Sequence, residues 1–156
     1  MSKNDCYERL NRQLKDLLAG ERDFLPNAAN TAALIYHGLP ELNWAGFYLL
    51  RQGELVLGPF QGKPACTRIA PGRGVCGRAA KERRTVIVED VHQFPGHIAC
   101  DADSNAEIVV PLVDAGELIG LLDLDSPRRS RFDAEDRTGL EMIVETFLAS
   151  TDLSTI

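Results

Sequence analysis

Apolar residues recur at helical spacing through the first part of the chain. Between residues 7 and 18, one tyrosine and four leucines fall mostly three or four positions apart, and Gly20 follows as a stop signal. A second, alanine-rich stretch runs from Pro26 to about His37 and ends at Gly38. The pattern predicts two helices, within about 3–38, that precede a sheet.

From Leu42 the pattern changes to short apolar and β-branched runs separated by turn residues. We expect strands at 43–50, 54–57, 85–88, 107–113 and 117–125, with turns at 51–53 and 114–116. A short helix is expected at 75–84. The Gly- and Pro-containing segments 58–74 and 91–106 are predicted to be long irregular loops of the kind that carry function.

Asp133 is a good N-cap for a last helix at about 133–149, which has one apolar face. Hairpin-connected strands flanked by terminal helices imply an α+β fold, with a largely antiparallel central sheet and the terminal helices packed on one face. No repeat or linker interrupts the pattern. We therefore expect a single domain over 1–156, with the sheet and candidate active-site loops at about 42–126.

Composition narrows the possible partners. The 156 residues carry 17 Lys+Arg against 23 Asp+Glu, a net charge of −6, whereas a protein that binds nucleic acid needs a basic face. No apolar run approaches the roughly 20 residues that span a bilayer, and the polar first residues do not form a signal peptide. We expect a cytoplasmic protein that binds neither nucleic acid nor membrane.

Four cysteines are the residues that say most about chemistry. In a reducing compartment they are expected to be reactive, metal-binding or simply buried, rather than joined in permanent disulfides. No two have the close spacing of paired zinc ligands, which leaves a mixed site with His92 or His97 as the alternative. A phosphate-binding loop is also missing from the sequence. We expect neither a metal nor a cofactor.

Cys66, Cys76 and Cys100 lie in or beside the Gly- and Pro-containing segments, and this placement favours thiol redox chemistry. Cys76 begins the expected short helix, where unpaired N–H groups and the helix dipole favour a thiolate. Cys6 lies beside the first helix and is expected to be incidental. The alternative for each cysteine is that it is a small buried apolar residue.

Negative charge follows Cys100, because Asp101 and Asp103 come next. Such charge disfavours a free thiolate. Either His97 or a backbone donor offsets it, or the thiol is activated only when substrate arrives. The sequence leaves both explanations open.

Acidic and aromatic side chains form a second group of candidates. Asp123 and Asp125 alternate with leucines and so share one face of a strand, and Glu107 opens the preceding strand. Crowded carboxylates can bind an ammonium group or retain a proton for acid catalysis; alternatively they only end the strand and cap a turn. Trp44 and Tyr48 share a strand face, either as core or as the lining of an apolar pocket.

These motifs together closely resemble the free methionine-(R)-sulfoxide reductases, which are catalytically active members of the GAF-domain superfamily. The resemblance covers nearly the whole chain and implies a single GAF-like domain. It rests on the following residues: Trp44, Gly58–Gly62, Cys66, Gly72–Gly77, His97–Asp101, Glu107–Pro111 and Leu122–Ser126.

The resemblance implies reduction of free L-methionine (R)-sulfoxide with electrons from thioredoxin, by a homodimer. Cys100 matches the catalytic cysteine, and Cys66 and Cys76 match cysteines that resolve the intermediate, with the principal one left open. The acidic residues that bind the substrate in this family match Glu107, Asp123 and Asp125. The aromatic residues that line its pocket match Trp44 and Tyr48. The alternatives are a noncatalytic GAF module that binds a small ligand, and a redox sensor that uses the same cysteines without turnover.

Overall fold

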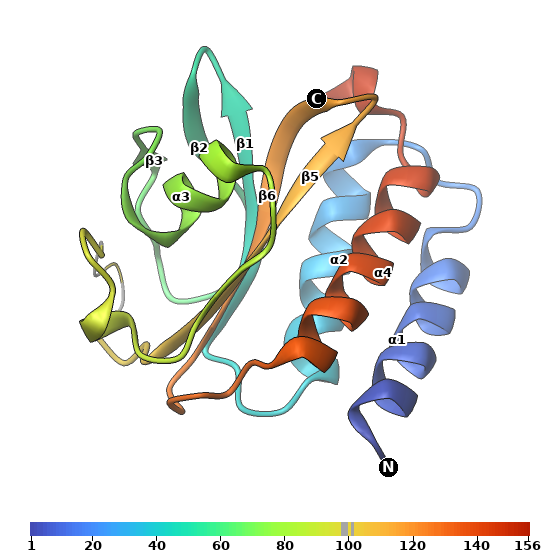
Figure 1. Cartoon of the computed structure of the whole chain (residues 1–156). Coiled ribbons are helices and arrows are strands. Elements are labelled where there is room, and N and C mark those ends of the chain that lie inside the picture. Colours follow the sequence, from blue (N-terminus) through green and yellow to red (C-terminus); the bar gives the residue numbers. More distant parts are fainter. Residues whose placement is uncertain (98–99, 101) are drawn as a thin grey trace.

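The computed structural model, which describes residues 1–97, 100 and 102–156, confirms the predicted α+β fold (Figure 1). Asp101, named above, is outside this part of the chain. The elements follow in the order α1 (Lys3–Leu18), α2 (Phe24–Gly38), β1 (Trp44–Arg51), β2 (Glu54–Gly62), β3 (Arg68–Ile69), α3 (Gly74–Glu82), β4 (Val86–Val88), the 3₁₀ turn Val91–Gln93, β5 (Ala106–Asp114), β6 (Glu117–Ser126), α4 (Ala134–Ser150) and the 3₁₀ turn Leu153–Thr155.

The strands form one sheet in the order β3-β2-β1-β6-β5-β4, and each neighbouring pair is antiparallel. Both predicted hairpins, β1–β2 and β5–β6, are present. The long central pairing of β1 with β6 places Gly46 opposite Asp123. This pairing brings the aromatic and the acidic motifs, which are far apart in the sequence, onto neighbouring strands.

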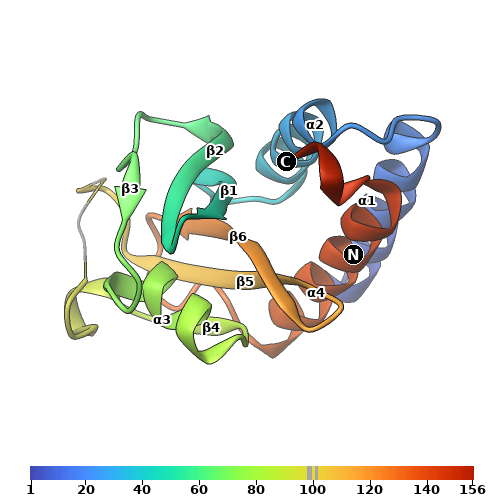
Figure 2. The same ribbon diagram turned by 90° about the horizontal axis from the view of Figure 1, so that it is seen from above.

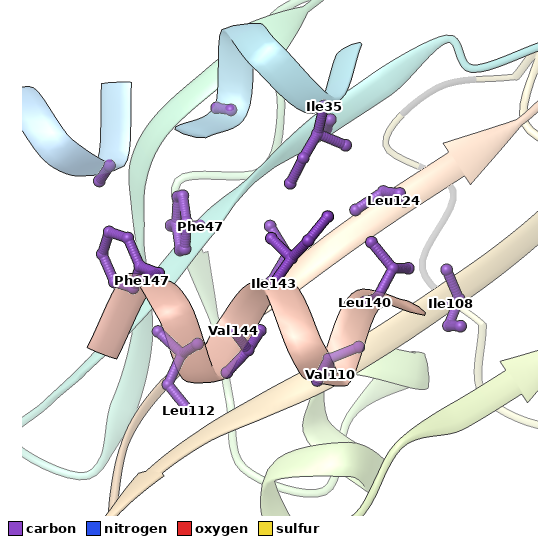
Figure 3. Packing of buried hydrophobic residues seen from close by; sticks show 14 of the residues in the cluster. Ile35, Phe47, Ile108, Val110, Leu112, Leu124, Leu140, Ile143, Val144 and Phe147 are labelled. Carbon is purple, nitrogen blue, oxygen red and sulfur yellow. The ribbon is translucent and has the colours of Figure 1, made fainter. Parts of the chain in front are cut away.

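Helices cover the two faces of the sheet unequally (Figures 1 and 2). On one face α2 and α4 pack against the strands, and α1 packs against both helices. Figure 3 shows how Phe47 of β1 and Leu124 of β6 meet Ile143 and Phe147 of α4 in this core. The other face carries α3, which contacts β4, β5 and β6.

Strand alternation decides which residues face α3. In β1, Ala45, Phe47 and Leu49 enter the core under α2 and α4, whereas Trp44 and Tyr48 belong to a separate cluster beside α3. A side chain on a strand points to the opposite face from its neighbour. Glu107, Asp123 and Asp125 share the face of Trp44 by the same rule, so the predicted functional residues lie on the α3 side.

The prediction of an irregular segment over 58–74 is partly wrong. Strand β2 continues to Gly62, which lies opposite Trp44, and β3 forms at Arg68–Ile69. Pro59 is tolerated because the β1–β2 register shifts between Gly46 and Tyr48, and proline occurs in strands at such bulges. A local sequence pattern does not reveal a pairing that depends on the partner strand.

The predicted start of the second helix is also late by two residues. Asp23 caps α2 by accepting a hydrogen bond from the Leu25 N–H at 3.1 Å, so Pro26 falls in the first turn, where proline is tolerated. Within the described chain, no helix combines the length and the apolar character that crossing a membrane requires.

Candidate active site

A pocket opens between α3, the α3-facing side of the sheet and the segments that carry Cys66 and Cys100. Seven of the eight predicted site residues line it, and the eighth, Cys66, directly follows the lining residues Pro64 and Ala65. The structure thus brings together the eight residues predicted for catalysis and substrate binding. The seven predicted residues that line the pocket are Trp44, Tyr48, Cys76, Cys100, Glu107, Asp123 and Asp125.

Cys66 and Cys100, which are 34 positions apart in the sequence, are joined in a disulfide with their Cα atoms 5.7 Å apart. Cys100 is exposed and Cys66 is half-buried, so the bond lies where another molecule can reach it. Cys76 and Cys6 are free thiols. Cys6 packs against the α1, α2 and α4 core rather than the pocket.

Three carboxylates lie at the base of the pocket on β5 and β6. Glu107 and Asp123 are buried, and Asp125, which pairs with Glu107 across the strands, is half-buried. The Cys76 thiol donates a hydrogen bond to Glu107 Oε2 at an S–O distance of 3.7 Å. Asp123 Oδ1 is buried with no hydrogen-bond partner within the described residues. Asp123 Oδ1 can therefore accept a hydrogen bond from a ligand at the base of the pocket.

Burial raises the pKa of Glu107 well above its ordinary value, and the neighbouring Asp123 charge raises it further. Burial likewise raises the pKa of Asp123, with Asp125 adding to the effect. Such close carboxyls titrate as a unit rather than singly. The shifts favour retention of a proton in this cluster to a higher pH than in ordinary carboxyls, and a general acid needs such a proton.

Cys76 lies in the first turn of α3, at the start of the helix as predicted, but the expected thiolate is not favoured there. Burial raises the pKa of its thiol well above the usual value, and the charges of Asp123 and Glu107 raise it further. The helix N-terminus acts in the opposite direction and is outweighed. Cys76 is thus suited to donate a hydrogen bond rather than to attack as a nucleophile.

Trp44 and Tyr48 stack with their ring centroids 6.0 Å apart, and Phe60 of β2 stacks on Trp44 at 5.2 Å. Trp44 and Tyr48, which line the pocket, also form hydrogen bonds with the segment that carries Cys66. Trp44 Nε1 donates to the Lys63 carbonyl at 3.1 Å, and the Tyr48 hydroxyl donates to the Cys66 carbonyl at 2.8 Å. The aromatic wall and the position of Cys66 are therefore coupled.

The first turn of α3 also lines the pocket. Arg73 stands at the N-cap without a side-chain capping bond, and Gly74, Val75 and Cys76 follow it along the wall. The first N–H groups of a helix have no partner within the helix and carry partial positive charge. The start of α3 consequently favours a negatively charged group of a ligand, whereas the carboxyls on β5 and β6 favour a positively charged one.

The ligand atoms of Cys76, Glu107 and Asp123 lie within 4.8 Å of one another, close enough to raise the question of a metal ion. A metal needs the thiolate and carboxylate forms, but the pKa of all three groups is raised. Structural zinc sites also prefer four cysteine and histidine ligands. The donor set fits a proton-sharing cluster better than a metal site.

Comparison with known proteins defines the family. The GAF domain model matches residues 27–148. A free methionine-R-sulfoxide reductase from Escherichia coli is 55% identical over 155 residues, which cover 97% of this chain and 94% of that protein. The chain belongs to the free methionine-R-sulfoxide reductase family of GAF domains. This result confirms the resemblance drawn from the sequence motifs.

Two solved structures of similar proteins agree with a GAF domain, and the name of the first also agrees with the reductase family. A Staphylococcus aureus fRMsr complex with substrate matches with a TM-score of 0.89 and 49% identity, over 92% of this chain and 94% of that one. A putative GAF sensor protein from Burkholderia vietnamiensis matches with a TM-score of 0.94 and 57% identity, over 97% and 96%.

Sequence reasoning missed several residues that line the pocket of this reductase-family chain. Arg73 could have been found because it lies only two positions before the predicted short helix. Ile69 and Ser104 lie in segments that were predicted to be irregular, so no pattern indicated the direction of their side chains. His97, considered as an electrostatic aid to Cys100 and as an alternative metal ligand, does line the pocket, and burial lowers its pKa.

The substitution Glu107→Gln is expected to alter how stability depends on pH. A carboxyl whose pKa rises on folding binds more protons in the folded state than in the unfolded state once the pH exceeds its ordinary pKa. The resulting penalty is absent in acid and grows as the pH rises toward the raised pKa. Glutamine removes this penalty, so the wild type should lose stability relative to Glu107→Gln as the pH rises from acidic values to neutrality.

Urea unfolding of both proteins across this pH range measures the difference in unfolding free energy. Glu117→Gln, at an exposed position on the same sheet, serves as the control and should show no such trend. A constant difference between the wild type and Glu107→Gln at every pH would contradict the raised pKa.

Proposed function

We propose that this protein reduces free L-methionine (R)-sulfoxide to methionine, with Cys100 as the nucleophile and Cys66 as the resolving thiol. The observation that carries the proposal is the Cys66–Cys100 disulfide at the rim of a pocket with buried acids at its base. Sulfoxide reduction needs a nucleophilic sulfur and an acid close to the oxygen that is removed. Both are present in one pocket.

The charges in the pocket suit a free amino acid. We propose that Asp125 and Asp123 hold the substrate ammonium group, and that the N–H groups at the start of α3, with Arg73, hold its carboxylate. The aromatic faces of Trp44 and Tyr48 would then contact the S-methyl group. A methionine within a peptide lacks both charged groups, so this arrangement selects the free amino acid.

In the first step, the Cys100 sulfur attacks the sulfoxide sulfur while the carboxyl cluster around Glu107 gives a proton to the sulfoxide oxygen. The oxygen leaves the substrate and ends on Cys100 as a sulfenic acid, and methionine is released. Cys100 is oxidised and the substrate sulfur is reduced by the same two electrons. This route needs no permanent thiolate, because proton donation to the oxygen assists the attack.

In the second step, the Cys66 thiol attacks the sulfenic sulfur of Cys100 and the oxygen leaves as water. The product is the disulfide seen in the structure. Cys76, the other predicted resolving residue, is buried and its pKa is raised. We therefore propose that Cys66 is the principal resolving residue and that Cys76 helps to hold the Glu107 carboxyl in position through its hydrogen bond.

In the third step, an external dithiol reopens the disulfide by thiol–disulfide exchange. The exposed position of Cys100 allows a protein such as thioredoxin to reach the bond. We propose thioredoxin as this reductant and the cytoplasm as the compartment that supplies it. A homodimer, implied by the family resemblance, is proposed as the assembly and can be tested by sedimentation analysis.

Turnover of racemic free methionine sulfoxide in the presence of thioredoxin, its reductase and NADPH tests the proposal. Consumption should stop when half of the substrate remains, and chiral chromatography should find only the S epimer left. A peptide that contains methionine sulfoxide should not be reduced. Binding of the amino acid without turnover would instead support the noncatalytic sensor, and a disulfide formed with peroxide alone would support the redox sensor.

A further inference from the structure

One ion pair joins the two segments that carry the disulfide cysteines. Lys63 precedes Cys66 by three positions, and Asp103 follows Cys100 by three. Lys63 Nζ lies 2.9 Å from Asp103 Oδ2, and both side chains are 68% exposed. The pair lies outside the residues that line the pocket, so substrate binding does not explain it.

The Lys63 side of this pair starts from a well-anchored backbone. Its carbonyl accepts a hydrogen bond from the Trp44 indole, and the Cys66 carbonyl accepts one from Tyr48. The Thr67 carbonyl accepts the Leu57 N–H of β2 at 3.0 Å. The Lys63 ammonium therefore extends from a segment whose position relative to Cys66 is fixed.

The Asp103 side is fixed near its base. The Asn105 carbonyl accepts the Val91 N–H at 2.8 Å, and the Asn105 side chain bonds to His92 Nε2 at 3.0 Å. Ser104 Oγ accepts from Asn43 at 3.1 Å. Asp103 thus lies in the sequence between Cys100 and the hydrogen-bonded residues Ser104 and Asn105. An attraction on the Asp103 carboxylate therefore influences the position of the segment that carries Cys100.

We propose that Lys63 is a positioning residue for the disulfide-forming step, acting through its attraction for Asp103. The inference rests on the proposed function. In that step the Cys66 S–H attacks the Cys100 sulfenic sulfur, an S–S bond forms, the S–O bond breaks and the oxygen leaves as water. The Lys63–Asp103 pair keeps the Cys100 segment beside Cys66 and so raises the effective concentration of the attacking thiol.

Rapid mixing of reduced protein with free methionine sulfoxide separates the two steps. Methionine release, followed by quenching and chromatography, reports the first step. Formation of the Cys66–Cys100 disulfide, followed by alkylation of the quenched protein and peptide mapping, reports the second. Lys63→Glu replaces attraction by repulsion and should lower the rate of the second step relative to the first by about two- to fivefold, the range expected for an exposed pair. Asp103→Lys should act in the same direction.

The charge-swapped double variant Lys63→Glu/Asp103→Lys restores the attraction and should recover most of the wild-type rate. Arg68→Glu is the matched control. It makes the same charge change two positions after Cys66, in an exposed pair with Glu54 that does not reach the Cys100 segment, and should leave the ratio of the two rates unchanged. A merely structural defect would not be repaired by exchanging the charges.

Ionic strength gives an independent readout. Salt screens exposed ion pairs, so the second step of the wild type should slow as salt is raised, whereas that of Lys63→Glu should not slow. Equal rates of disulfide formation in the wild type and Lys63→Glu, or a double variant as slow as the single ones, would overturn the role of Lys63. Failure of the wild type to release methionine would instead overturn the proposed function.

Discussion

Substitution Cys100→Ser is expected to lower the rate of methionine formation by about 10³-fold or more, the scale seen when a covalent nucleophile is removed. A serine hydroxyl is not ionised near neutral pH, and its oxygen cannot take up the sulfoxide oxygen and pass it on as water. Chromatographic assay of methionine with a dithiol reductant in excess measures the loss. Cys100→Ser removes the disulfide, so folding is checked by thermal unfolding of the reduced wild type alongside it.

Binding distinguishes a lost nucleophile from a damaged pocket. Cys100→Ser should still bind the R epimer in calorimetric titration, because the carboxylates, the aromatic wall and the start of α3 are unchanged. Cys6→Ser, which alters a thiol outside the pocket, should keep full turnover. If Cys100→Ser retains turnover within tenfold of the wild type, Cys100 is not the nucleophile.

The substitution Cys66→Ser has the second largest expected effect and a different signature. Turnover with thioredoxin should fall by about 10²-fold or more, because thioredoxin reduces its partners by thiol–disulfide exchange and this variant cannot form the Cys66–Cys100 disulfide. The first methionine per chain should still be released at the wild-type rate. The protein should then carry one added oxygen at Cys100, which a sulfenic-acid reagent and mass spectrometry detect.

Cys76→Ser is the matched control for the choice of resolving residue. Cys76 is free and buried in the structure while Cys66 is bonded to Cys100. We therefore expect Cys76→Ser to form the disulfide and to turn over with thioredoxin, with a loss confined to what the hydrogen bond to Glu107 contributes. The opposite result, loss in Cys76→Ser and full turnover in Cys66→Ser, would exchange the roles of the two cysteines.

The arrangement of the pocket follows in large part from strand alternation. Trp44 and Tyr48, four positions apart in the sequence, share a face, and so do Asp123 and Asp125, two positions apart. Period-two alternation is a local property that each strand carries in its own sequence. The predicted hairpins then place these strands in one antiparallel sheet, so the acidic and aromatic motifs could be assigned to a common region without coordinates.

Other features depend on contacts between distant segments and were not predictable. The strand that ends at Gly62 was expected to end near Leu57, because its continuation depends on pairing with Trp44 across a bulge. The thiol of Cys76 was expected to ionise readily, since its helix position is visible in the sequence but its burial beside Glu107 is not. The Lys63–Asp103 ion pair likewise joins residues 40 positions apart.

A single-turnover experiment tests most directly whether this pocket reduces the free amino acid by way of Cys100 and Cys66. Fully reduced protein is mixed with excess racemic free methionine sulfoxide without any reductant, and both the released methionine and the cysteines are then analysed. We predict one methionine per chain, derived from the R epimer, and a Cys66–Cys100 disulfide in the peptide map, with Cys6 and Cys76 still open to alkylation. Absence of methionine, or a disulfide that leaves Cys100 free, would contradict the account.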